Sequence, residues 1–230
     1  MLQKSAPARP IPPGSRGITK ESTMSDNVGA TAARVEDGVM MGVSYVQPED
    51  ATPEVQAFYK DAEERFKALL NIFKVFGHHP EYGIPWTAVI MAILKEGPEL
   101  DWLTKELLII KATLRNDCQY CVLQHERLSV SLGMPEAKIR DLQADKYRTS
   151  PLFTEGEKAL MDLTEQIWKD ANRLPRDLWR RLHEHYTEAQ IVEAVFVITM
   201  YIQVSKFGDA LGVVLEPMFD GVDPILEVHH

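Results

Sequence analysis

The stretch ELLIIKATLRNDCQYCVLQH, residues 106–125, holds both cysteines of the chain, and the other segments are interpreted around it. The run at residues 107–114 is apolar nearly all round, which predicts a buried central helix. Further on, Cys118, Cys121 and His125 are spaced i, i+3 and i+7. If the chain is helical from Cys118 onward, two thiols and an imidazole share one stripe of that helix.

This spacing favours thiol chemistry. A cysteine reacts as its thiolate, and its pKa falls at a helix N-terminus, beside a histidine or within a CxxC motif. The helix dipole favours an anion at Cys118, in the expected first turn, whereas stacking on His125 at i+4 favours Cys121. Two such thiols can also close a disulfide if their β-carbons lie within about 4 Å. Glu106, on the preceding helix, could accept and return protons if it is partly buried.

Composition limits the classes of partner. The chain has 230 residues, 45% of them hydrophobic, which is enough for one sizeable core or two small lobes. Its net charge of −9, with acids and bases interspersed, argues against nucleic acid or an anionic membrane as the main partner. No apolar run is long enough to span a bilayer, and no secretory signal is evident. We therefore expect a cytoplasmic protein whose CxxC is redox-active or metal-binding.

The order of predicted elements indicates an all-α fold. Residues 1–44 are rich in Pro, Gly, Ser and Ala and are expected to form a flexible, extended or disordered arm. Residues 45–217 form the expected helical domain and residues 218–230 a C-terminal tail. We identify no hairpin signal and no sustained alternation of apolar and polar residues of the kind that strands show. Helices are predicted from Pro53, over 69–76 and 81–95, after Asp101 or Thr104, from Asp117 or Cys118 to Leu132, over 135–142, from Thr154 to 170, over 176–186 and from Thr187 to 210.

A weak internal repeat is also present. The segments LTKELLIIKATL (103–114) and YTEAQIVEAVFVITMY (186–201) are each followed by a Leu-Gly pair, at 132–133 and 211–212. This pattern suggests a duplicated helical unit in which only the first copy carries cysteines.

Two simpler interpretations of the CxxC remain open. The cysteines could be packed, reduced thiols, because free cysteine is among the most buried residue types. Alternatively, the motif and His125 could supply three zinc ligands and His78, His79, His183 or His185 a fourth, although zinc sites usually show a second ligand pair. We expect no bound metal and no other cofactor.

The motif resembles that of a known family. Glu106, eleven further residues, Cys118-Gln119-Tyr120-Cys121, three residues and His125 are similar to the signature of AhpD-like alkylhydroperoxidases in the carboxymuconolactone decarboxylase superfamily. The resemblance covers roughly residues 45–217, including the His79-Pro80 helix start and the C-terminal apolar helix. Tyr120 is a departure, since one member has a histidine just before the second cysteine.

The resemblance implies an all-helical dithiol peroxidase or disulfide reductase that reduces alkyl hydroperoxides and assembles as a homo-oligomer, commonly a trimer or hexamer. It implies that Cys121 attacks the peroxide, Cys118 resolves the intermediate, and His125 with Glu106 relays the proton. A lipoyl protein or a thioredoxin-like protein would then restore the dithiol.

Two other function classes stay open at this point. One is a non-enzymatic redox or zinc-binding scaffold that binds a partner protein. The other is a divergent carboxymuconolactone decarboxylase-type enzyme acting on a small cyclic acid, which the cysteine pair makes less favoured because the decarboxylases lack it.

Overall fold

The computed structural model describes residues 35–36, 39–95, 97 and 99–226, and almost all of its regular structure is helical. This confirms the prediction of an all-α fold for the part of the chain that is described. The 3-10 helices are η1 (Pro48–Asp50), η2 (Lys146–Arg148) and η3 (Pro217–Phe219). The α-helices are α2 (Pro53–Phe66), α3 (Asn71–Phe76), α4 (Pro80–Ile93), α5 (Trp102–Arg115), α6 (Gln119–Ser131), α7 (Glu136–Gln143), α8 (Glu155–Asp170), α9 (Arg176–His185) and α10 (Glu188–Ala210).

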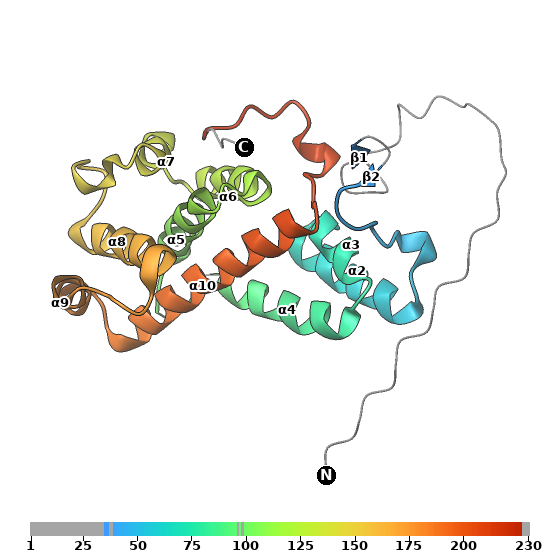
Figure 1. Ribbon diagram of the computed structural model, residues 1–230, viewed down its shortest axis with the longest axis horizontal. Helices are drawn as coiled ribbons and strands as arrows, with labels where there is room; N and C mark the ends of the chain where they lie inside the picture. Colours follow the sequence, from blue (N-terminus) through green and yellow to red (C-terminus); the bar gives the residue numbers. More distant parts are fainter. Residues whose placement is uncertain (1–34, 37–38, 96, 98, 227–230) are drawn as a thin grey trace, which may run out of the picture.

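Helix α10 organises the arrangement of the others. It runs across the molecule, with α5 to α9 towards one end and α2 to α4 towards the other (Figure 1). It packs against α5, α6 and α8, while α2, α3 and α4 pack against one another. A buried helix of this kind is apolar on most of its faces. Helix α6, which follows Cys118, contacts both α5 and α10.

Helix α5 is the central helix that its apolar run predicts. Every residue from Lys105 to Thr113 is buried, and the helix contacts α6, α7, α8 and α10. The charged members of this run need partners at such depth. The ammonium of Lys105 donates to the carbonyl oxygen of Lys95 at 2.6 Å and lies 3.6 Å from the carboxylate of Glu193 on α10.

One prediction about α10 is too strict. We expected no segment long enough to span a bilayer, yet α10 has the length and the apolar composition to do so. Such a helix also suits the core of a water-exposed fold, and α10 packs against three other helices here. The core accounts for the apolar residues of α10 that are buried, among them Ala194, Val197 and Ile198.

Polar side chains fix the helix starts as predicted. Thr52 and Asp101 cap α2 and α5 by accepting backbone N–H groups of Val55 and Thr104, at 3.4 and 2.9 Å. Thr154 begins α8 with the expected capping box, in which its partner Glu157 accepts the backbone N–H of Thr154. A second capping box, formed by Thr187 and Gln190, begins α10.

The N-terminal part differs from the prediction. Strands β1 (Val35–Glu36) and β2 (Val39–Met40) pair antiparallel, with Val35 opposite Met40, so the expectation that no hairpin occurs is wrong. The sequence does contain the signal, because Asp37-Gly38 between the strands is a typical hairpin dipeptide. The predicted flexible arm falls largely on residues 1–34 and 37–38, outside the described residues.

The predicted repeat corresponds to two helices in direct contact, α5 and α10. The glycines of the two Leu-Gly pairs, Gly133 and Gly212, both have positive φ values, 100° and 68°. Glycine readily adopts this left-handed conformation after a helix. The duplication itself, and the boundaries proposed at residues 44 and 217, stay predictions.

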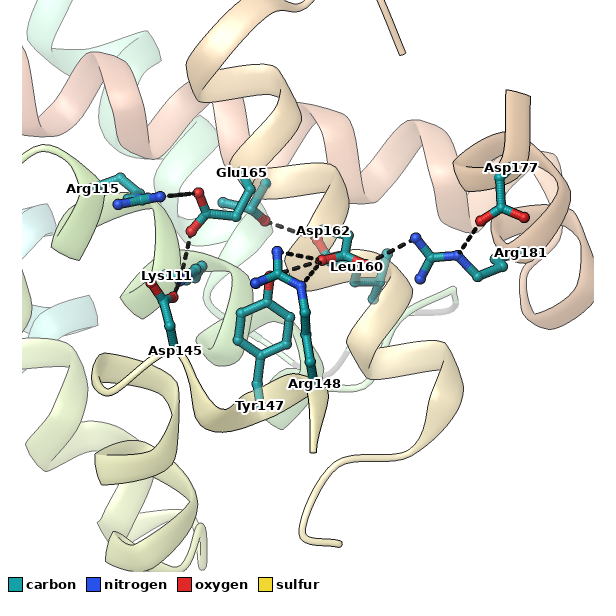
Figure 2. Close-up of polar contacts among 11 residues, drawn as sticks. Lys111, Arg115, Asp145, Tyr147, Arg148, Leu160, Asp162, Glu165, Asp177 and Arg181 are labelled. Carbon is teal, nitrogen blue, oxygen red and sulfur yellow. Dashed lines mark hydrogen bonds and ion pairs between the residues drawn. The ribbon is translucent and has the colours of Figure 1, made fainter. Parts of the chain in front are cut away.

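A network of ion pairs joins α5, η2, α8 and α9 (Figure 2). At its buried end, the ammonium of Lys111 lies 2.5 Å from a carboxylate oxygen of Asp145 and 2.6 Å from one of Glu165. Glu165 also pairs with Arg115. At the other end, Asp162 binds Arg148 and Arg181, each at 2.8 Å. The two sets of ion pairs meet on α8, which carries Glu165 and Asp162, and they link this helix to α5, η2 and α9.

The network yields a stability prediction. Glu165→Gln should lower the free energy of unfolding by about 2 kcal/mol, because the buried Lys111 ammonium loses one of its two carboxylates and keeps only that of Asp145. The measurement is urea unfolding followed by circular dichroism. Asp61→Asn, which breaks the exposed Arg65 pair on α2, is the matched control and should cause little change. Equal losses in the two variants would contradict the structural role given to the network.

Candidate active site

The two cysteines lie at the start of α6. Cys118 is the N-cap residue, and its backbone N–H donates to the Thr113 carbonyl oxygen at 3.2 Å, which ties α6 to the end of α5. Asp117, between the two helices, has a left-handed backbone with φ of 54°. Both cysteines are free thiols and buried, and their Sγ atoms are 2.9 Å apart. A disulfide, with an S–S bond of about 2.05 Å, needs only a small approach of the two sulfurs.

A buried carboxylate holds the histidine. Glu106 is fully buried on α5, and its Oε2 lies 2.8 Å from Nδ1 of His125. Trp102 Nε1 donates to the other oxygen at 3.0 Å, and the Ser129 hydroxyl lies 3.5 Å from Oε2. Because a carboxylate is an acceptor, we infer that the neutral imidazole carries its proton on Nδ1, so that Nε2 is the acceptor nitrogen.

The surroundings of Cys121 favour the protonated form of its thiol. The pKa of this thiol is raised well above its ordinary value, first by its hydrogen bond with Cys118 and then by burial. The Ser205 hydroxyl, 3.8 Å from Cys121 Sγ, acts in the opposite direction. A nearby base is therefore required before Cys121 can act as a thiolate at neutral pH.

Tyr120, between the cysteines, is tied to the C-terminal part of the chain. Its hydroxyl donates to Glu216 Oε1 at 2.9 Å. The same carboxylate accepts the backbone N–H of Asn71 at 2.7 Å and the side-chain amide of Gln124 at 3.2 Å. Burial raises the pKa of both Tyr120 and Glu216. Tyr120 therefore stays a hydrogen-bond donor near neutral pH.

An apolar cavity of about 220 Å³ adjoins these groups. Cys121 and His125 both line it, and the ring of Tyr201 meets the imidazole edge-on with centroids 4.9 Å apart. Among the described residues that line it there is no lysine or arginine. Its other lining residues are Phe66, Ala68, Leu70, Ile72, Phe73, Trp86, Ile90, Leu94, Tyr120, Gln124, Leu128, Val204, Met218 and Phe219. The cavity therefore suits an uncharged, largely apolar molecule.

The structure brings together all four site residues expected from the sequence. Glu106 contacts His125, His125 shares the cavity with Cys121, and Cys121 contacts Cys118. Their catalytic roles remain predictions.

Sequence reasoning missed other residues of the site: Trp102, Ser205 and Glu216. Trp102 could have been found, since it precedes Glu106 by four residues on one helix. Ser205 and Glu216 come from segments more than 80 residues from the CxxC, and no local pattern marks them.

The zinc alternative gains no fourth ligand from the residues considered for it. His78 contacts the Ser44 carbonyl oxygen at 2.9 Å, and His79 contacts Glu81 at 3.1 Å. His183 stacks on Trp179. None of these histidines, nor His185, lines the cavity beside Cys121. Among the residues described, no group of three or more His, Cys, Asp or Glu side chains is placed to hold a metal ion.

Comparison with known proteins identifies relatives. The model of the carboxymuconolactone decarboxylase family matches residues 80–166. The chain is 30% identical over 110 residues to the uncharacterized protein YdfG of Bacillus subtilis (strain 168), covering 47% of this chain and 74% of that protein.

Two solved structures share the fold. One is the alkylhydroperoxidase AhpD core of a peroxidase-related protein from Ralstonia eutropha JMP134, with a TM-score of 0.65, 15% identity and coverage of 75% of this chain and 90% of that one. The other is the debrominase Bmp8, with a TM-score of 0.64, 17% identity and coverage of 75% and 91%. At these identities the two structures establish the fold of the chain.

The raised pKa of Cys121 predicts how the rate of its alkylation depends on pH. A thiol with a raised pKa is largely protonated near neutrality, so its alkylation by iodoacetamide should keep accelerating as pH rises through and beyond about 8.5, the ordinary cysteine pKa. The rate is measured by mass spectrometry on reduced protein. Cys118→Ser removes the strongest cause of the shift and should move the profile to lower pH. A wild-type profile that levels off below about pH 8 would contradict this.

Proposed function

Because the chain belongs to the carboxymuconolactone decarboxylase family, in its AhpD-like group, we propose that it is a CxxC-dependent thiol peroxidase or disulfide reductase acting on alkyl hydroperoxides. One observation carries the proposal. Cys121, one thiol of the pair, and His125, which the buried Glu106 carboxylate holds, line the same small apolar cavity. A nucleophile and a base that a third group orients are the usual components of covalent catalysis.

Proton transfer to the histidine comes first in the proposed reaction. Nε2 of His125 accepts the Cys121 proton while Glu106 stabilises the resulting imidazolium. The Cys121 sulfur then attacks the terminal oxygen of ROOH, so that an S–O bond forms and the O–O bond breaks. His125 returns the proton to the alkoxide, which leaves as ROH, and Cys121 is left as a sulfenic acid.

Cys118 completes the first half of the cycle. Its sulfur, 2.9 Å from that of Cys121 before oxidation, attacks the sulfenic acid. An S–S bond forms, the S–O bond breaks, and the hydroxide leaves as water with the Cys118 proton. We propose that an external dithiol, a lipoyl group or a thioredoxin-like protein, then reduces the disulfide through a mixed disulfide. The close spacing of the sulfurs supports disulfide formation, and the assignment of Cys118 as resolving thiol is supported by Cys121, not Cys118, lining the cavity.

The cavity supports hydroperoxides over cyclic acids as substrates. Burying a carboxylate is costly without a cation, and neither lysine nor arginine lines the described part of this cavity. A second candidate class is halogenated aromatic compounds. The cavity is rich in aromatic rings, and the structurally similar Bmp8 is a debrominase, of which a cysteine-to-alanine variant has been solved in complex with 2,3,4-tribromopyrrole.

We further propose that the protein works in the cytoplasm as a homo-oligomer, a trimer or a hexamer. Large apolar side chains that are exposed in one chain support such an assembly. Ile84 on α4 is 43% exposed, and Val192 and Phe196 on α10 are 68% and 49% exposed. Exposed apolar groups of this size commonly mark subunit contacts when they cluster.

A thiol count tests the proposed reaction. Reduced protein treated with one equivalent of cumene hydroperoxide should lose two hydrogens by mass spectrometry, because both thiols enter one disulfide. Cys118→Ser should stop at a sulfenic acid that dimedone traps on Cys121, whereas Cys121→Ser should give no rapid product.

Substrates and controls separate the alternatives. The same assay with 2,3,4-tribromopyrrole in place of the peroxide tests the second class. No disulfide within minutes with either compound would overturn the proposal, and tightly held stoichiometric zinc would favour the metal-binding scaffold. Sulfenic acid trapped on Cys118 in Cys121→Ser would reverse the assignment of the two sulfurs.

A further inference from the structure

The C-terminal segment, residues 214–226, leaves the end of α10 and turns back over α6 (Figure 1). It lies outside the region matched by the family model, which ends at residue 166. We propose that this segment forms a specificity-determining wall of the cavity, and that Met218 and Phe219 select compact apolar substrates. The proposal rests on the thiol peroxidase function proposed above.

The first anchor of the segment is Glu216. Its carboxylate accepts hydrogen bonds from the Tyr120 hydroxyl and the Gln124 amide on α6 and from the backbone N–H of Asn71 on α3. The Asn71 side chain returns a hydrogen bond to the carbonyl oxygen of Val214 at 2.9 Å. Glu216 is only 5% exposed, so these donors replace water around its carboxylate. The segment is thereby fixed to the residue between the two cysteines.

The second anchor is Glu126, which is fully buried on α6 next to His125 in the sequence. Its two oxygens accept the backbone N–H groups of Ile225 and Leu226, at 2.7 and 2.9 Å. Arg140 donates to the Ile225 carbonyl oxygen at 3.1 Å. Both apolar side chains are buried, with Leu226 only 1% exposed. The segment is therefore fixed to α6 at both ends, and residues 217–224 bridge the two anchors.

Helix η3 lies between the anchors and carries the wall. Met218 and Phe219 line the same cavity as Cys121 and His125. Met218 is 57% exposed, which places it at the rim, while Phe219 is half-buried. Cys121 itself is only 3% exposed, so a substrate reaches its sulfur through this cavity. The side chains at 218 and 219 thus help to set how large a group can enter.

The volume of the cavity indicates how large a substrate can bind in it. Its volume of about 220 Å³ is below the roughly 300–1,000 Å³ typical of pockets for drug-sized ligands. Apolar side chains supply most of its surface. The fitting substrate is a hydroperoxide with one compact apolar group, such as a single ring or a short branched chain.

Substitutions of opposite size test the wall. The measurement is the second-order rate constant of disulfide formation with cumene hydroperoxide, divided by that with hydrogen peroxide, which is too small to contact the wall. Met218→Trp should lower this ratio by about tenfold, because a group that no longer fits an apolar pocket costs at least that much. Phe219→Ala should raise the ratio for a bulkier hydroperoxide. Leu152→Trp, at an exposed loop position outside the cavity, should leave the ratio unchanged.

The design separates the failure of this inference from that of the proposed function. If wild type reacts and Met218→Trp and Phe219→Ala both leave the ratio unchanged, the wall has no role in selection and the inference is wrong. If wild type is unreactive towards every peroxide, the peroxidase function fails. In that case calorimetric binding of the product analogue 2-phenyl-2-propanol still tests the wall, with about tenfold weaker binding expected for Met218→Trp. Binding unaffected by this substitution, or no binding by wild type, overturns the inference.

Discussion

The burial of the Glu106 carboxylate is the constraint on which the site depends. A charged carboxylate at this depth is costly unless donors surround it, and the fold supplies the indole of Trp102 and the imidazole of His125. The contact with His125 ties α5 to α6, and the imidazole lines the cavity. Cys121, one helical turn before His125, lines the same cavity. The contact between Glu106 and His125 thus serves both the packing of α5 on α6 and the orientation of the imidazole.

The cysteine pair follows from the same arrangement. The two sulfurs lie 2.9 Å apart, both side chains are buried, and the hydrogen bond with Cys118 and burial raise the pKa of the Cys121 thiol. In the proposed reaction, a small hydroperoxide enters the cavity and His125 acts as the base. The C-terminal segment closes the arrangement, because Glu216 and Glu126 attach it to the helix that carries the thiols.

Local patterns predict the helical framework well, and they single out four residues that the structure brings together. Capping residues such as Thr154 and Thr187 specify helix starts through hydrogen bonds within four residues, so sequence alone reveals them. The hairpin was missed although Asp37-Gly38 signals it. Contacts made by Glu216 and Ser205 bring together segments far apart in the sequence. Their pairing depends on how α10 packs against α6, which no short-range pattern encodes.

The central claim is that Glu106 holds the Nδ1 proton of His125 and so leaves Nε2 to accept the thiol proton. Nitrogen-15 NMR of reduced, histidine-labelled protein, with His125→Gln used to assign the signal, tests this directly. The account predicts a His125 ring with a protonated Nδ1 and an unprotonated Nε2, and loss of this preference in Glu106→Gln. A neutral ring protonated on Nε2, or a tautomer unaffected by Glu106→Gln, would contradict it.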